Sequence, residues 1–495
     1  MNKSVKVAAG VIIVAGVIAT AGAWYTGKRL EGVLGDAVVQ ANQQIQAALV
    51  GHEGNASVSL LSLDRHFFSS TAHYRFVFQS PKLNDGHPVE LLFTDEIEHG
   101  PLPWSRVKSL QLVPVMAASN LQLEKNLFSE KWFAMTNGQA PLTGHFSMGY
   151  DRAAQGRVEF LPFEFSDQNG AFKFSGFTLN ASGSGDGQKL EANGLLGSFD
   201  VTASSEEGPV HLSLKDVTFN TGGTKGKSGF YLGHSDAKVA SVIFQAAGRP
   251  PVELNNFVNT SLLQEVEGNL NAQVTYDIDK IRFDGKDIGA AQMLWKFANF
   301  DIASTKSLLK IYQEKVQPQA QAAAAMGESY TPHLSAADQA LVQAEVGKLL
   351  AAKPHVELEK LSLKTANGES HFSLSMDLAN PTSLDQPGAA LLKQLLTQLD
   401  AKLLLSKPMI RDLAALQASS AGLTDPAAVA EQARGAAESV GGMAIMLQMG
   451  KVEGDNIVST LHYADDVVDF NGQKMSAQQF AAAMMGKFVM LNGGQ

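Results

Sequence analysis

Apolar and polar residues alternate along most of the first 300 residues of the chain. Between about 55 and 300 the alternation has a period of two, which places successive side chains on opposite faces of a β-strand. Clusters of Gly, Asn, Asp and Ser interrupt these runs at the spacing of hairpins. Examples are SVSLLSLDRHFF (57–68), RVEFLPFEF (157–165), AFKFSGFTL (171–179) and PVHLSLKDV (209–217). We predict a large, mostly antiparallel sheet, either a sandwich or one long curved sheet.

After residue 300 the apolar residues recur mainly at helical spacing. Ser335 and Asp338 form a start signal for a helix within 302–352. Regularly spaced leucines predict a further helix over 387–404, and Thr424-Asp425-Pro426 opens another over 425–447. A last helix is predicted from about residue 476.

Strands also occur in this second half. Residues 356–378 read as a hairpin, whose Asn367-Gly368 pair would supply left-handed residues to a tight turn. A second turn, Asn471-Gly472, precedes the closing helix. The predicted fold class is therefore α+β, with a sheet body, helical C-terminal insertions and a closing strand–turn–helix.

The first 30 residues contain the longest apolar run. Residues 7–27 carry no charge and end in Trp24-Tyr25, before Lys28-Arg29. About 20 apolar residues span a bilayer, and Trp and Tyr favour the headgroup boundary, so we predict a transmembrane anchor. A cleaved signal peptide is the alternative. Both interpretations place the rest of the chain outside the cytoplasm.

The chain is accordingly divided into five segments. Residues 1–6 form a cytoplasmic tail, 7–27 the anchor and 28–50 an amphipathic helix or linker, in which Leu34, Ala41 and Ile45 share one face. Residues 51–300 form a β-rich domain. Residues 301–495 form a mixed helix and strand domain packed on the sheet.

Composition narrows the classes of partner. The net charge is −10, so no basic field exists to neutralise phosphates and we expect no nucleic-acid partner. The chain contains no cysteine, which excludes thiol nucleophiles, disulfides and Cys-ligated metals. Gly226-Lys227-Ser228 lacks the first glycine and the following helix of a phosphate-binding loop. We expect no cofactor.

The stretch TDEIEHGPLPWS (94–105) is the strongest candidate for chemistry. Asp95, Glu96 and Glu98 precede His99, and further histidines occur at 66, 73 and 87. No local spacing brings two imidazoles to one metal, so we expect no metal site. Along a strand, Glu96 and Glu98 would share the solvent face, and Gly100-Pro101 would turn the chain. We interpret Glu98, His99, Gly100 and Pro101 as a structural corner, with His99 capping backbone groups.

The Phe-rich strands support a second interpretation. If their apolar face is open rather than a closed core, it would form a groove for lipids or other apolar ligands. The candidate lining residues are Phe163, Phe165, Phe172, Phe174 and Phe177.

Four features of the chain occur together: the N-terminal anchor, Glu98-His99-Gly100-Pro101, DGKDIGAAQMLWKFANFD (284–301) and DFNGQKMSAQQF (469–480). In this combination the whole chain resembles the YdgA-like family of bacterial envelope proteins, a family of uncharacterised function. The resemblance implies a single-pass protein of the bacterial inner membrane with its body in the periplasm, and self-association into a homo-oligomer. It supplies no catalytic residues.

Three functions remain open from the sequence. The first is a non-enzymatic, membrane-anchored scaffold or binding surface in the envelope. The second is a module that binds or transfers lipid, by analogy with AsmA-like envelope proteins, which share the plan of one anchor and a β-rich body. The third is an envelope hydrolase that uses two carboxylates among Asp95, Glu96 and Glu98.

Overall fold

The computed structural model describes residues 34–36, 38–39, 41–43, 45, 55–79, 87–168, 170–205, 208–320 and 331–492. The chain divides into two compact units. Unit 1 comprises Met1–Ser204, Ser213–Gly233 and Leu309–Gln339, and unit 2 comprises Ser205–Leu212, His234–Leu308 and Ala340–Gln495. Residues of both units occur in β11 (Gly208–Lys225), β12 (Tyr231–Gln245), α5 (Ile302–Ile311) and α7 (Ala336–Ala351), and the last residue of β10 (Lys189–Ser205) belongs to unit 2. A π-helical turn, Tyr312–Val316, follows α5.

Unit 1 contains one antiparallel sheet. Neighbouring strands pair in the order β1-β2-β3-β4-β5-β6-β9-β10, and the second half of β10 pairs with β8, which pairs with β7. The strands are β1 Asn55–Arg65, β2 Ser69–Gln79, β3 Val89–His99, β4 Ala117–Leu123, β5 Leu142–Met148, β6 Ala154–Phe160, β7 Phe163–Asp167, β8 Gly170–Phe174, β9 Phe177–Gly183 and β10 Lys189–Ser205, and the short helices are α3 Trp104–Lys108 and α4 Glu130–Met135.

One face of this sheet carries the core of unit 1. Tyr74, Phe93 and Ile97 are almost completely buried there, as the period-two pattern predicts. The described residues between 34 and 45 are helical, and Leu34, Ala41 and Ile45 belong to the same core. The predicted amphipathic helix is therefore confirmed over these residues, and it covers the apolar face of the sheet.

The side chain of Asn42 joins this helix to the first strand. Its amide donates to the Val58 carbonyl oxygen at 2.9 Å and accepts from the Val58 N–H at 2.8 Å. We expect Asn42→Ala to lower the free energy of unfolding by about 1–2 kcal/mol, because it leaves a partly buried peptide group without its partner. Thermal unfolding measures the loss. Asn42→Gln, which retains the amide, should recover part of it, and equal stability of all three proteins would contradict the assignment.

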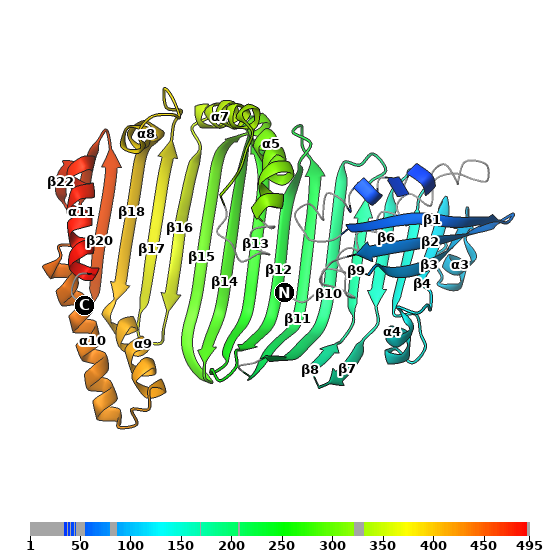
Figure 1. The fold of residues 1–495 in the computed structure, drawn as a ribbon, viewed down its shortest axis with the longest axis horizontal. Coiled ribbons are helices and arrows are strands. Elements are labelled where there is room, and N and C mark those ends of the chain that lie inside the picture. The colour runs from blue at the N-terminus through cyan, green and yellow to red at the C-terminus, as the bar shows by residue number, and fades with distance from the viewer. Residues whose placement is uncertain are drawn as a thin grey trace. The chain divides into compact units, whose positions relative to one another are not determined.

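Unit 2 also contains one antiparallel sheet. The strands pair in the order β13-β14-β15-β16-β17-β18-β20, with β19 and β21 both on β20 and β22 on β21. Figure 1 shows β13 to β18 side by side. The strands are β13 Val252–Val266, β14 Asn269–Phe283, β15 Lys286–Asp301, β16 His355–Lys364, β17 Glu369–Leu378, β18 Leu396–Ser406, β19 Lys451–Glu453, β20 Asn456–Ala464, β21 Val467–Phe470 and β22 Gln473–Ser476, and the helices are α8 Gly388–Leu395, α9 Lys407–Ser420, α10 Pro426–Met446 and α11 Ala477–Asn492.

The predicted helix over 387–404 is wrong beyond Leu395. Only α8 is helical, and the chain continues as β18 between β17 and β20. Leu399 and Leu403 fit helical spacing and also the alternation of a strand, and pairing on both sides of β18 favours the strand. The helix α9, which starts at Lys407 with its first turn capped by Ser406, was not predicted.

The two predicted Asn-Gly turns differ. Asn471 and Gly472 have φ values of 55° and 84°, which confirms the left-handed turn. Neither Asn367 nor Gly368 has a positive φ, so the predicted left-handed pair at the 356–378 hairpin is wrong. Gly368 instead lies against the start of α9, where an added Cβ would be 2.1 Å from Ser406 Oγ. The hairpin itself, the helix opened by Ser335 and the closing helix are confirmed.

Each unit is therefore α+β with a single-layered, mostly antiparallel sheet, and the described strands do not form the sandwich that was the alternative. In the part of the chain that the structure describes, no helix has the length and apolar character needed to cross a membrane. The predicted anchor, 7–27, lies outside the described residues.

Candidate functional site

The corner predicted at Glu98–Pro101 is a tightly packed turn at the end of β3. The Gly100-Pro101 peptide bond is cis, and the Gly100 N–H donates to the Met116 carbonyl oxygen at 2.7 Å. A Cβ on Gly100 would lie 1.9 Å from the Val115 carbonyl oxygen. Only glycine therefore fits between the end of β3 and the segment that leads into β4.

Glu98 and His99 attach this turn to its neighbours. The Glu98 carboxylate accepts hydrogen bonds from the Ser105 N–H, at 2.9 Å from Oε2, and from the Ser105 hydroxyl, and so positions α3. The His99 Nε2 and the Ser70 Oγ are 3.1 Å apart. His99 thus bonds a side chain through its ring, whereas a backbone group was the expected partner.

Asp95 is separated from the other two acids by the alternation of β3. Glu96 is exposed and Glu98 half-buried, whereas Asp95 has no exposed surface and lies among core residues. Ser119 Oγ donates to Asp95 Oδ1 at 2.6 Å, but Asp95 Oδ2 and the buried Tyr74 hydroxyl have no hydrogen-bond partner among the described residues. Burial raises the pKa of Asp95 from 3.8 to about 6, opposed by the hydrogen bonds from Ser119 and the Asn120 backbone.

The polar side chains of this region do not converge on one point. His66 and His87 are exposed, and His73 Nδ1 lies 2.8 Å from Glu124 Oε1 on the face opposite Asp95. Across the described ranges, no three His, Asp or Glu side chains are close enough to hold a metal ion. The arrangement offers a buried acid and a structural turn, and the hydrolase hypothesis stays an untested prediction.

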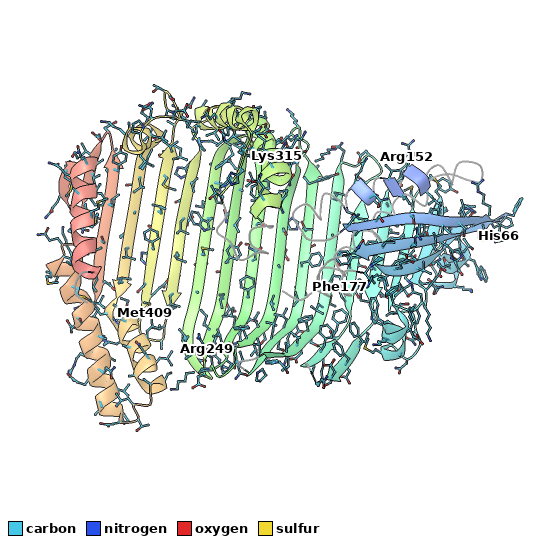
Figure 2. The ribbon with its side chains drawn as sticks, in the orientation of Figure 1. His66, Arg152, Phe177, Arg249, Lys315 and Met409 are labelled. Atoms are coloured by element: carbon cyan, nitrogen blue, oxygen red, sulfur yellow. The ribbon has the colours of Figure 1, made fainter. Side chains whose placement is uncertain are left out.

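Four of the five candidate phenylalanines form a row of neighbouring rings, and Phe177 is linked to this row through Phe160 and Trp132. We call the whole row the aromatic strip. Phe163 stacks on Phe172 at 5.4 Å between centroids and tilts against Phe174 at 5.4 Å, and Phe165 stacks on Phe172 at 5.8 Å. Phe177, labelled in Figure 2, lies 6.2 Å from Phe160. Four further rings, not predicted from the sequence, extend the strip: Trp132, Phe160, Phe199 and Phe219.

The aromatic strip starts in the core of unit 1 and leads to its surface. Phe160 is 7% exposed, Phe163, Phe172 and Phe174 are half-buried, and Phe165 is 47% exposed. On the other face of the same hairpin, Lys173 pairs with Glu164 at 3.4 Å, and both are exposed. The hairpin β7–β8 thus presents one aromatic and one charged face.

Unit 2 has a comparable surface, which we call the apolar face. In-register pairing places apolar residues in rows that cross β14, β15, β16, β17, β18 and β20. Most are half-buried, and Leu361 is 44% exposed. Among the described residues of unit 2, a buried cluster forms at the margin of the sheet, around Tyr463, Val468 and Phe470. Two of the rows are Val274-Trp295-Leu358-Leu374-Ala401-Leu461 and Ala272-Phe297-Val356-Met376-Leu399-Tyr463.

The sequence has curated bacterial relatives along almost its entire length. It is 27% identical over 504 residues to the protein YdgA of Escherichia coli (strain K12), covering 99% of this chain and 97% of that protein. It is 23% identical to the uncharacterized protein YihF of the same organism, covering 98% and 99%. An uncharacterized protein of Haemophilus influenzae is 24% identical over 63% of this chain.

No solved structure matches the chain. A family model described as a bacterial protein of unknown function, DUF945, matches residues 1–478. The resemblance stated from the sequence is thereby confirmed, and the chain belongs to the DUF945 family of bacterial proteins.

Proposed function

We propose that this protein is a non-enzymatic, membrane-anchored protein of the bacterial envelope whose sheets hold the acyl chains of lipids. The observation that carries the proposal is the aromatic strip, a continuous row of rings that leaves the core and becomes exposed at the β7–β8 hairpin. Large apolar side chains such as phenylalanine are normally buried, and a contiguous exposed apolar surface usually marks an interaction site.

The chemistry of the aromatic strip suits an acyl chain. Covering a further ~50 Å² on each of five rings would remove ~250 Å² of apolar surface from water, which is worth about 6 kcal/mol before the cost of association. Its flanking charges, Glu164 and Lys173, lie on the opposite face of the hairpin, so an apolar ligand on the strip does not have to desolvate them.

The apolar face of unit 2 adds a second surface of suitable size. A row across six strands has five strand spacings and is therefore about 24 Å long. The acyl region of one membrane leaflet is about 15 Å deep, half of a ~30 Å hydrocarbon core. A row of this length accommodates an extended acyl chain. The predicted anchor, 7–27, would hold both surfaces close to a source of lipid.

The test is the amount of lipid that remains with protein purified from membranes. A double variant, Phe163→Ser and Phe172→Ser, replaces two rings at the centre of the aromatic strip with polar side chains. Glu164→Ser with Lys173→Ser changes the charged face of the same hairpin and is the matched control. Mass spectrometry of extracted lipids should show several-fold less lipid per protein for the phenylalanine variant and an unchanged amount for the control.

Other outcomes would argue against acyl-chain binding. Equal lipid retention by both variants would show that lipid is held elsewhere or nonspecifically. If the phenylalanine variant instead converts an oligomer to a monomer in light scattering, while lipid content stays constant, the aromatic strip is a contact between copies and the protein is a scaffold.

A further inference from the structure

The other face of the unit 1 sheet contains a polar cleft of about 520 Å³. Its floor is formed by β4, β5, β6, β9 and β10, and its wall by α3 with the residues that follow it. This face is opposite the one that carries the core and the aromatic strip, since strand residues alternate between faces. The cleft is therefore a separate surface from the proposed acyl-chain site.

Register aligns the polar side chains of the floor into two rows. The first row is Ala118-Ser147-Gln155-Ser182-Glu191, and the second is Asn120-His145-Arg157-Asn180-Asn193. Each row crosses four strand spacings, about 19 Å. Eight of these ten positions carry an amide, hydroxyl, imidazole or guanidinium group, and a ninth carries the Glu191 carboxylate. All nine polar groups therefore lie on a single surface.

The corner at Glu98 brings Arg106 into this cleft. Glu98 fixes Ser105 at the start of α3, and the next residue, Arg106, lines the cleft and donates from one terminal nitrogen to Ser147 Oγ at 3.3 Å. Its Nε is buried without an acceptor among the described residues. A guanidinium has five N–H groups, so most of its donor capacity is unused.

The charges of the cleft balance. Arg157 Nε donates to Glu159 Oε1 at 2.6 Å. Glu191 also lines the cleft, so the carboxylates of Glu159 and Glu191 equal in number the two guanidinium groups, those of Arg106 and Arg157. His145 Nδ1 and Asn120 Oδ1 are 2.9 Å apart, and Asn180 Nδ2 donates to Asn193 Oδ1 at 3.0 Å. Each of these amides retains further donor or acceptor positions. The surface therefore matches a neutral ligand that both donates and accepts hydrogen bonds along its length.

We propose that this cleft binds a neutral oligosaccharide. Hydroxyl groups donate and accept, as the two rows require, and a chain of sugars can extend across the five strands. A peptide would lack its usual modes of binding. The backbone of β4, β5, β6 and β9 is already paired on both sides, and Phe146, which lies under the cleft, is buried in the core. A phosphate is disfavoured, because the positive charges of the cleft are matched in number by carboxylates.

The test uses the full chain in detergent, with chitotetraose and cellotetraose as probes in saturation-transfer NMR. At least one probe should receive saturation and bind with a Kd of about 1 mM. Arg106→Ala and Asn193→Ala should each weaken binding about tenfold through loss of hydrogen bonds. Lys108→Ala, on the same helix beside Trp104 and outside the cleft, is the control and should bind like wild type.

Asn193 is exposed on β10, so its substitution does not depend on the folding of α3. Thermal unfolding of both variants should match wild type. The proposal is overturned if neither tetrasaccharide receives saturation, if both cleft variants bind as wild type does, or if millimolar inorganic phosphate displaces the sugar, which would show an anion site. Lipid retention is measured on the same samples and stays unchanged in the cleft variants.

Discussion

Asp95→Asn is expected to gain stability relative to wild type as the pH rises, by about 2.5 kcal/mol between pH 4 and pH 8. The Asp95 carboxyl has a pKa of 3.8 when unfolded and about 6 when folded. Between these values the folded protein binds more protons than the unfolded chain, so the stability of wild type falls as pH rises and the loss is complete above pH 6. The whole shift corresponds to about 3 kcal/mol, of which about 0.5 kcal/mol is already lost at pH 4.

The measurement is the free energy of unfolding of both proteins in denaturant from pH 4 to pH 8. At pH 4 the free energy of unfolding of Asp95→Asn should equal that of wild type or be lower, because the buried amide N–H₂ group in the position of Oδ2 would have no acceptor. Tyr74→Phe removes the neighbouring unpaired hydroxyl without removing the acid, so it should retain the pH dependence of wild type. If the free energy of unfolding depends on pH in the same way for Asp95→Asn and wild type, burial does not raise the pKa of Asp95.

Gly100→Ala is expected to lower the free energy of unfolding by about 3 kcal/mol. The new methyl group would lie 1.9 Å from the Val115 carbonyl oxygen and 2.8 Å from that of Met116. Both atoms belong to the backbone, so a side-chain rotation cannot relieve the clash, and the turn between β3 and β4 has to move. Thermal and denaturant unfolding would measure the effect.

Gly35→Ala is the matched control for this substitution. Gly35 is a helical residue of unit 1, and nothing lies within 4 Å of the Cβ that alanine would add. Alanine at such a position stabilises a helix by about 0.5–1 kcal/mol. The same chemical change should therefore have opposite effects at the two positions. A Gly100→Ala protein as stable as wild type would show that the turn is not as closely packed as described.

Local patterns were sufficient for much of this fold. The alternation in TDEIEH correctly places Ile97 inside and Glu96 and Glu98 outside. The same alternation puts Asp95 inside with Phe93 and Ile97. This burial could have been predicted from the sequence, but Asp95 was grouped with Glu96 and Glu98 as one cluster of acids. The charge of Asp95 argued against burial, and only the packed structure shows that Ser119 and the Asn120 backbone compensate for part of it.

The remaining features depend on pairing between distant segments. β18 was predicted as helix because its leucines fit both periods. Its identity is decided by pairing with β17 and β20, whose partner residues lie up to 66 residues away in the sequence. The polar cleft requires the register of five strands, because each of these strands contributes only one residue to each of the two rows of its floor. Phe199 and Phe219 could not be assigned to the aromatic strip from the sequence either, because they contact Phe172 and Phe177 from segments distant in the chain.

The single-layered sheet of unit 2 has a consequence for how such a protein can change in evolution. From β13 to β18, each strand depends mainly on its two neighbours, and a central core shared by all of them is not present among the described residues. As in repeat proteins, a hairpin can then be gained or lost without repacking the rest. Each such event changes the length of the apolar rows by two strand spacings, about 10 Å. If the apolar face holds acyl chains as we propose, the number of strands sets the length of chain that it accommodates.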